Sequence, residues 1–383
     1  MTERAAWEGN VDLFMTGAAI AVDTVEPLGG NATEYLSSVT FDVTTADVPS
    51  GATLQAAYLY WGGDHRGAGV EDDCASGPPT YSSGLNTDEI TFTAPGEPSA
   101  LITAEAAYCE PGAGSYDLRV FRADVTAHIS TIAGTYTVED YAGPNGRTSG
   151  NSTDNASTAL LLVYEVSSIA PRRVVLFDGL RVLIAGASET TTFTGLDVDS
   201  TPEATLTMWA LEGDDCASCT DSVQVDGNGA TNGPITLSDA YNDPTNIFNG
   251  TINTSTPAQT GLAGVDIDEF DISAGLDARD TSIDVTYAAG GEKYWHAVNV
   301  ISVKLYEPFL AENSEKTWVL WDDADGDLEP TFGDTIRYTI TLANTGNEGG
   351  TTDILDPIPP EAELVGVVEP LPAGSRDLSL IHI

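Results

Sequence analysis

The chain has 383 residues, of which 59 are acidic and 14 are basic, so its formal net charge at pH 7 is −45. This charge repels nucleic acid and anionic membranes, and no basic stripe offsets it, so a nucleic-acid-binding protein is excluded. Hydrophobic residues make up 41% of the chain, a composition typical of folded domains and not of disordered ones. No run of about 18 apolar residues occurs, so we expect no membrane insertion.

The first ten residues contain three charged residues and no apolar core segment, so they are not a signal peptide. Taken alone, this would favour a cytoplasmic protein. The other features below favour a secreted one, and we therefore expect the chain to be a fragment whose signal peptide lies upstream.

Short apolar runs rich in β-branched and aromatic residues follow one another along the chain, each bounded by Gly, Pro, Asn or Asp. No longer run shows helical periodicity with caps. The pattern predicts an all-β protein of antiparallel sheets packed as sandwiches. The expected strands are residues 54–61, 89–92, 118–125, 135–139, 159–166, 173–183, 204–210, 222–225, 282–287 and 295–306.

A weak internal repeat accompanies these strands. The segments Val-Asp-Leu-Phe (11–14) and Val-Val-Leu-Phe (174–177) open the two copies, and strands that end in Gly-Asp at Asp64 and Asp214 precede a Cys loop in each. Each copy closes on a strand that ends in Tyr-Glu, at residues 164–165 and 306–307. We therefore predict two tandem jelly-roll-like lobes, residues 1–170 and 171–310. Chance similarity among strands is the alternative.

The four cysteines lie in or near acidic loops rich in Gly and Ser. An even number of cysteines in the loops of a β-rich chain predicts two disulfides, Cys74–Cys109 and Cys216–Cys219. A four-cysteine zinc site is the competing interpretation, but only one Cys-x-x-Cys pair is present. A redox motif is disfavoured because no βαβ pattern surrounds the pair.

From residue 311 onward the sequence changes character. It runs through Trp-Val-Leu-Trp (318–321), Gly-Asp-Thr-Ile-Arg-Tyr-Thr-Ile-Thr (333–341), Asn-Thr-Gly (344–346) and Asp-Pro-Ile-Pro (356–359). This order resembles the repeat of long bacterial and archaeal surface proteins catalogued as domain of unknown function eleven, over residues 318–369. The resemblance implies an Ig-like sandwich, truncated here to residues 311–377, of the kind that repeats in tandem as a stalk. The preceding lobes are more loosely similar to the β-sandwich heads that accompany such repeats.

The last six residues, Leu-Ser-Leu-Ile-His-Ile (378–383), do not fit the acidic, Pro-rich segment before them. They back-translate into CTG TCT CTT ATA CAC ATC, the transposon end used to fragment DNA for sequencing. We therefore expect this segment to be a sequencing-adapter artefact. A genuine apolar tail is the alternative.

The best candidate metal site is Asp323-Ala-Asp325-Gly-Asp327, where alternating carboxylates and a Gly resemble a Ca²⁺ loop. Asp334 occupies the position where an EF-hand loop has a bidentate Glu, but its side chain is one carbon shorter. The loop predicts Ca²⁺ as the one candidate cofactor, with a solvated, metal-free hairpin as the alternative.

No catalytic motif stands out: there is no Gly-x-Ser-x-Gly elbow, phosphate loop, dinucleotide fingerprint or His-Glu-x-x-His. Trp61 and Trp209, at matched places in the repeat, suggest sugar-stacking platforms, although buried sandwich tryptophans are the expected role. His65 lies in an acidic loop, and His296 is expected to be an ordinary histidine of a strand.

These features predict a non-catalytic structural or adhesive protein, extracellular or at a cell surface, that carries two heads on a stalk of Ig-like repeats. Its partners would be surface glycans or proteins. The alternative is a carbohydrate-binding accessory module of a secreted polysaccharide-active enzyme, which exposed tryptophans would favour. A third possibility is that the chain is itself an enzyme, which measurable glycan hydrolysis would support.

Overall fold

The computed structural model describes residues 1–22, 34–64, 74, 87–111, 117–142, 155–213, 215–216, 218–229, 231–306, 315–342, 357, 360, 362–366 and 380–382. These residues form antiparallel sheets and two short 3₁₀ helices, η1 (Thr126–His128) and η2 (Ser273–Gly275), which confirms the all-β prediction. No helix among them is long and apolar enough to cross a membrane.

The contacts divide the chain into two compact units, Met1–Leu305 and Tyr306–Ile383. The first unit contains both lobes, and the second contains the segment with the surface-protein resemblance. The predicted division into residues 1–170, 171–310, 311–377 and 378–383 stays a prediction.

The first lobe is a sandwich of two antiparallel sheets with a small ribbon beside it. Its inner sheet has the order β2 (Val11–Ala19), β12 (Ala156–Glu165), β6 (Thr53–Asp64), β10 (Asp117–Asp124), β9 (Ala106–Pro111). Its outer sheet has the order β5 (Ser38–Val43), β11 (Gly134–Glu139), β7 (Glu89–Thr93), β8 (Ala100–Thr103), and the ribbon pairs β3 (Ala21–Val22) with β4 (Glu34–Tyr35).

The second lobe repeats this arrangement. Its inner sheet has the order β1 (Thr2–Gly9), β13 (Arg172–Leu183), β20 (Tyr294–Lys304), β15 (Ala204–Leu211), β18 (Val265–Asp271). Its outer sheet has the order β14 (Ser188–Thr194), β19 (Ser282–Ala288), β16 (Ser222–Gly227), β17 (Ile235–Thr236).

Both lobes follow the jelly-roll order. Without β1, β9 and the β3–β4 ribbon, each lobe has eight strands, which can be counted from one to eight along the chain. In both lobes the inner sheet then has the order one, eight, three, six, and the outer sheet has the order two, seven, four, five. The matched strands of the sequence repeat are equivalent in the two lobes: β2 with β13, β6 with β15, and β12 with β20.

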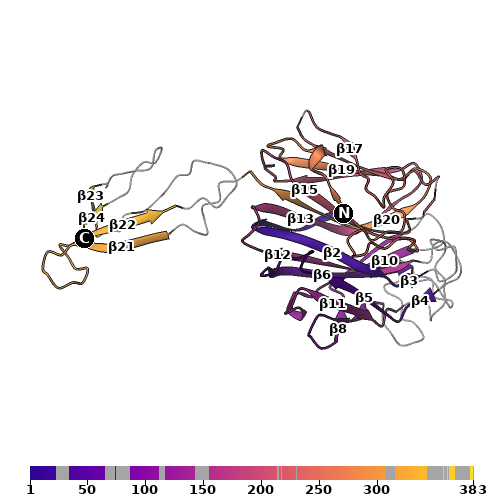
Figure 1. Ribbon diagram of the computed structural model, residues 1–383, viewed down its shortest axis with the longest axis horizontal. Helices are drawn as coiled ribbons and strands as arrows, with labels where there is room; N and C mark the ends of the chain where they lie inside the picture. The colour runs from indigo at the N-terminus through magenta and orange to yellow at the C-terminus, as the bar shows by residue number, and fades with distance from the viewer. Residues whose placement is uncertain are drawn as a thin grey trace. The chain divides into compact units, whose positions relative to one another are not determined.

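The two inner sheets pack face to face, so four sheets are stacked (Figure 1). One apolar core lies inside each lobe and a third lies between the lobes. The third core includes Met15 and Tyr60 from the first lobe and Trp209, Ile267 and Trp295 from the second, all fully buried. Burying each such side chain contributes roughly 1.5–3 kcal/mol, so this core binds the lobes into one unit.

The N-terminal strand β1 strengthens this union. It pairs antiparallel with β13 of the second lobe, with Trp7 opposite Val174, before the chain enters the first lobe at β2. Separating the lobes would therefore break a β-ladder in addition to exposing the apolar core.

The second unit is a four-stranded antiparallel sheet in the order β21 (Glu315–Asp322), β22 (Thr335–Thr341), β24 (Leu380–His382), β23 (Glu363–Gly366). Most of β21 is exposed, including Trp318 at 53% and Trp321 at 56%. The Arg337 guanidinium lies over the Trp321 ring, 4.8 Å from its centroid.

Candidate functional site

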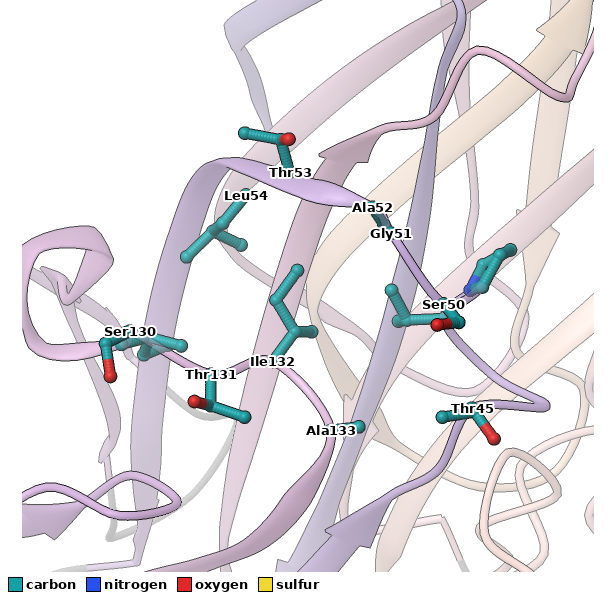
Figure 2. A pocket seen from close by; sticks show the side chains of 13 residues that line it. Thr45, Ser50, Gly51, Ala52, Thr53, Leu54, Ser130, Thr131, Ile132 and Ala133 are labelled. Carbon is teal, nitrogen blue, oxygen red and sulfur yellow. The ribbon is translucent and has the colours of Figure 1, made fainter.

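A hollow of about 540 Å³ opens on the first lobe, between the segment from Thr45 to Leu54 and the segment from Ile129 to Ala133 (Figure 2). Its volume would suit a small ligand. The residues that line it are aliphatic, hydroxyl-bearing, Gly or Pro, and none is charged or aromatic. This lining offers no acid, base or metal ligand, so the hollow is a weak candidate for catalysis.

The interface between the lobes, a common place for ligand sites in two-lobed proteins, is filled with side chains. The Tyr60 and Trp209 rings lie 6.0 Å apart across it, and Trp209 Nε1 donates a hydrogen bond of 3.0 Å to Ser157 Oγ of the first lobe. Trp61 is also fully buried and donates through Nε1 to the Thr87 carbonyl oxygen at 3.0 Å. The expectation that both matched tryptophans are buried is confirmed, so neither serves as a sugar platform.

A polar cluster lies at the edge of this interface, centred on the fully buried Asp178 of β13. Arg4 of β1 donates from Nε to both carboxylate oxygens, at 3.1 and 3.2 Å, and Tyr60 donates to Oδ2 at 3.2 Å. Arg122 of β10 lies 3.6 Å from Asp178 Oδ2, and Arg4 also donates to the Tyr108 hydroxyl. The cluster joins strands of both lobes, with its charges paired inside the fold.

Burial and the Asp178 carboxylate raise the pKa of the Tyr60 hydroxyl well above its usual value. The hydrogen bond to Asp178 raises the pKa of the Arg4 guanidinium. Both groups therefore keep their protons at neutral pH, so the cluster holds the lobes together and provides no group for proton transfer.

The histidines do not form a site among the described residues. His296 is fully buried, its ring lies 4.4 Å from that of Tyr287, and burial lowers its pKa to about 3. It is therefore a neutral core histidine at pH 7, which confirms the expectation for a strand residue. His128 is exposed in η1, and His65 lies outside the described residues.

Both predicted disulfides are present. Cys74 is joined to Cys109 of β9 with 5.5 Å between their Cα atoms, and Cys216 is joined to Cys219 with 5.4 Å. A carboxylate oxygen of Glu292 lies 3.0 Å from Cys219 Sγ, so two sulfurs and a carboxylate come together at this point. With the sulfurs bonded to each other, the thiolates that zinc requires are absent.

The acidic loop of the second unit brings three of its four predicted ligands together. Carboxylate oxygens of Asp323, Asp325 and Asp327 lie within 4.8 Å of one another. Asp334 is fully buried and accepts from Ala324 N at 2.8 Å and Thr331 N at 2.7 Å, so it closes the base of the loop. Ca²⁺ binding here stays a prediction.

The same loop is also held by its own hydrogen bonds. Asp323 accepts from Gly326 N at 2.7 Å through Oδ1 and from Leu328 N at 2.9 Å through Oδ2. Asx-type turns of this kind form without an ion.

A second acidic cluster, which the sequence did not reveal, lies inside the second lobe. Asp221, Asp266 and Asp268 are 0%, 1% and 2% exposed. Burial and nearby carboxylates raise the pKa of Asp266 well above its ordinary value, and burial raises that of Asp268 to about 7. Buried carboxyls that oppose one another's ionisation are rare unless protons or a cation balance them.

Comparison with known proteins identifies no relative by sequence. No family model matches the chain, and no curated protein matches it. Several solved structures are similar to it at low identity. The crystal structure of the major capsid protein P2 from bacteriophage PM2 is 9% identical, with 77% of this chain and 100% of that one covered, at a TM-score of 0.21.

The infectious bursal disease virus VP2 subviral particle is 10% identical, with 78% of this chain and 73% of that one covered, at a TM-score of 0.24. The structure of PNGF-II in a P21 space group is 7% identical, with 78% and 66% covered, at a TM-score of 0.22. Likenesses at these scores carry no argument about function.

Proposed function

We propose that the chain is a non-catalytic structural or adhesive protein, secreted or held at a cell surface, in which the paired jelly rolls form a head on a stalk of Ig-like repeats. The observation that carries the proposal is the filled interface between the lobes, where Trp209, Trp295 and Tyr60 are fully buried. A cleft between lobes would supply a site for chemistry, whereas a packed core makes a rigid block.

Three further features support this proposal. The Cys74–Cys109 disulfide fits an oxidising compartment outside the cell. The net charge of −45 keeps neighbouring copies apart in a crowded envelope. The antiparallel pair β21–β22 of the second unit is compatible with the first part of an Ig-like repeat.

Adhesion is tested with the full chain coupled to beads, which are applied to prokaryotic cell-envelope preparations and to a panel of purified polysaccharides. We expect saturable binding that free chain competes away, with no release of reducing sugar. Sugar release that disappears when one acidic pair is changed to amides would make the chain an enzyme. An absence of binding to every surface would also contradict the proposal.

The same experiment separates adhesion from the accessory-module alternative. The buried Trp61 and Trp209 disfavour that alternative, but Trp318 and Trp321 of the second unit are exposed. Binding that is confined to one polysaccharide and lost in a variant with both exposed tryptophans changed to Ala would identify a carbohydrate-binding module. Adhesion through the head predicts that this variant binds like the wild type.

A further inference from the structure

The buried acidic cluster of the second lobe lies under a covering segment, residues 246–253. Asp266 and Asp268 occupy alternate positions on β18, so their side chains point to the same face of the sheet. Ile267 between them points to the opposite face and packs in the core between the lobes. Asp221 immediately precedes β16 of the outer sheet.

Each carboxylate accepts a main-chain hydrogen bond from the covering segment. Asp221 Oδ2 accepts from Phe248 N at 2.9 Å, Asp266 Oδ1 from Gly250 N at 2.8 Å, and Asp268 Oδ1 from Asn253 N at 3.0 Å. These bonds use one oxygen of each side chain and fix where the other points.

The second oxygens of Asp221 and Asp266 are buried and have no hydrogen-bond partner. A buried carboxylate oxygen without a partner is costly, and it commonly marks a bound ion or water. Asp266 Oδ2 and the Phe248 carbonyl oxygen lie 2.7 and 2.5 Å from the point that a β-carbon on Gly213 would occupy, so the two oxygens face a common space.

Negative charge accumulates here without a basic partner. Neither Asp221, Asp266 nor Asp268 forms an ion pair with any residue that the structure describes, and Asp221 also lies beside the Glu292 carboxyl. The pKa of Asp266 is raised by burial first, then by Asp268 and Asp221. A divalent cation bound here would offset this repulsion and give Asp266 Oδ2 a partner.

We propose that Asp221 Oδ1, Asp266 Oδ2 and the Phe248 carbonyl oxygen bind a calcium ion inside the second lobe. The donors are all oxygen, the set that Ca²⁺ prefers, and the irregular covering segment suits a cation with flexible geometry better than the strict octahedron of Mg²⁺. The ion fixes the covering segment to β18 and β16, and so stabilises the second lobe. This site is separate from the acidic loop of the second unit and does not depend on adhesion.

The experiment measures Ca²⁺ binding and thermal unfolding of the full chain after EDTA treatment. The test variants are Asp221→Asn and Asp266→Asn, which keep side-chain shape and remove charge. The matched controls are Asp284→Asn, an exposed change on β19, and the triple variant Asp323→Asn, Asp325→Asn, Asp327→Asn. At a hundredfold excess over Kd, Ca²⁺ should raise the Tm of the wild type by about 4 °C, and Mg²⁺ should do so much less.

The controls should keep this gain, and the two test variants should lose it together with the binding heat of the buried site. The proposal is wrong if Ca²⁺ leaves the wild-type Tm unchanged, which would mean that protons alone neutralise the carboxyls. It is also wrong if Asp266→Asn keeps the full gain, or if only the triple variant loses it.

Should a test variant fail to fold, hydrogen exchange on the wild type decides the question. Ca²⁺ should slow exchange of the Phe248, Gly250 and Thr251 amides, which the carboxylates already hold. Protection that maps to residues 323–334 alone would overturn the proposal.

Discussion

Changing Asp178 to Asn tests whether the polar cluster locks the two jelly rolls together. Asn preserves the shape of the side chain, so the change creates no cavity. It removes the negative charge and replaces one of the two acceptor oxygens with an NH₂ donor that faces the donors of Arg4 and Tyr60. Arg4 and Arg122 would then face a neutral amide, one from each lobe. Breaking a buried ion pair by removing one partner costs about 3–5 kcal/mol, because the remaining charge stays desolvated.

The structure places the expected loss at the lower end of this range. The Arg122 side chain is 9% exposed, but that of Arg4 is 33% exposed and regains water easily. We therefore expect a loss of about 3 kcal/mol. Globular proteins unfold with an entropy of about 2.1 cal/mol/K per residue. The unit Met1–Leu305 therefore has an unfolding entropy of about 0.6 kcal/mol/K, and the Tm should fall by about 5 °C.

The assay is differential scanning calorimetry at a fixed Ca²⁺ concentration, with Asp284→Asn as the control. Asp284 is exposed and accepts a hydrogen bond from Thr192, so its replacement should change stability by less than about 0.5 kcal/mol. The lobes of Asp178→Asn should still unfold in one transition because their apolar interface is intact. A Tm shift within about 1 °C of the control would refute the assignment of Asp178 as a buried charge that both lobes need.

Three further changes probe the interior. Gly17→Ala would place a β-carbon against the Thr158 carbonyl oxygen and 2.8 Å from Ile267 of the other lobe. We therefore expect the free energy of unfolding, measured in urea, to fall by about 2–3 kcal/mol. An unchanged urea midpoint would contradict the close approach of the two inner sheets. Asn299→Leu removes two buried amide atoms without partners and should raise stability by about 1–2 kcal/mol, whereas a loss would reveal a hidden partner. Burial lowers the pKa of His296 from 6.5 to about 3, so below pH 6.5 the unfolded chain binds one proton that the folded chain does not. The free energy of unfolding should therefore fall between pH 6.5 and pH 3 with a slope of about 1.4 kcal/mol per pH unit from this group. His296→Gln should remove this part of the pH dependence.

Much of the strand content could be predicted from the sequence. Each of the ten expected strands overlaps a strand of the structure, because β-branched runs between turn residues mark both sheets of a sandwich. Strand β1 was missed because its exposed alternation, Thr-Glu-Arg-Ala-Ala-Trp-Glu-Gly, contains three charged residues and no long apolar run. Its pairing with β13, about 170 residues away, is a tertiary fact that local pattern does not encode.

The buried acidic cluster could not be predicted for a different reason. The segment Val265-Asp-Ile-Asp has the alternation of an ordinary half-exposed strand, with apolar residues on one face and carboxylates on the other. Burial of Asp266 and Asp268 comes from the covering segment, residues 246–253, which contains no strand-like run. The chain has 59 acidic residues, so the composition does not distinguish these two aspartates from the exposed ones.

The sequences of the inner strands differ from those of the outer strands, and the difference reflects the packing of the two lobes against each other. In the outer sheets, β5 and β19 alternate between buried and less buried positions, as expected for strands with one face on a core and one in water. In the inner sheets, β12 and β20 are buried at every position but the last. The corresponding sequences, Ala-Leu-Leu-Leu-Val (159–163) and Ala-Val-Asn-Val-Ile (297–301), are almost unbroken apolar runs, which an antiparallel strand can sustain only where both faces are covered. Equivalent strands of both lobes carry this signal, and packing the two inner sheets on each other removes both apolar faces from water.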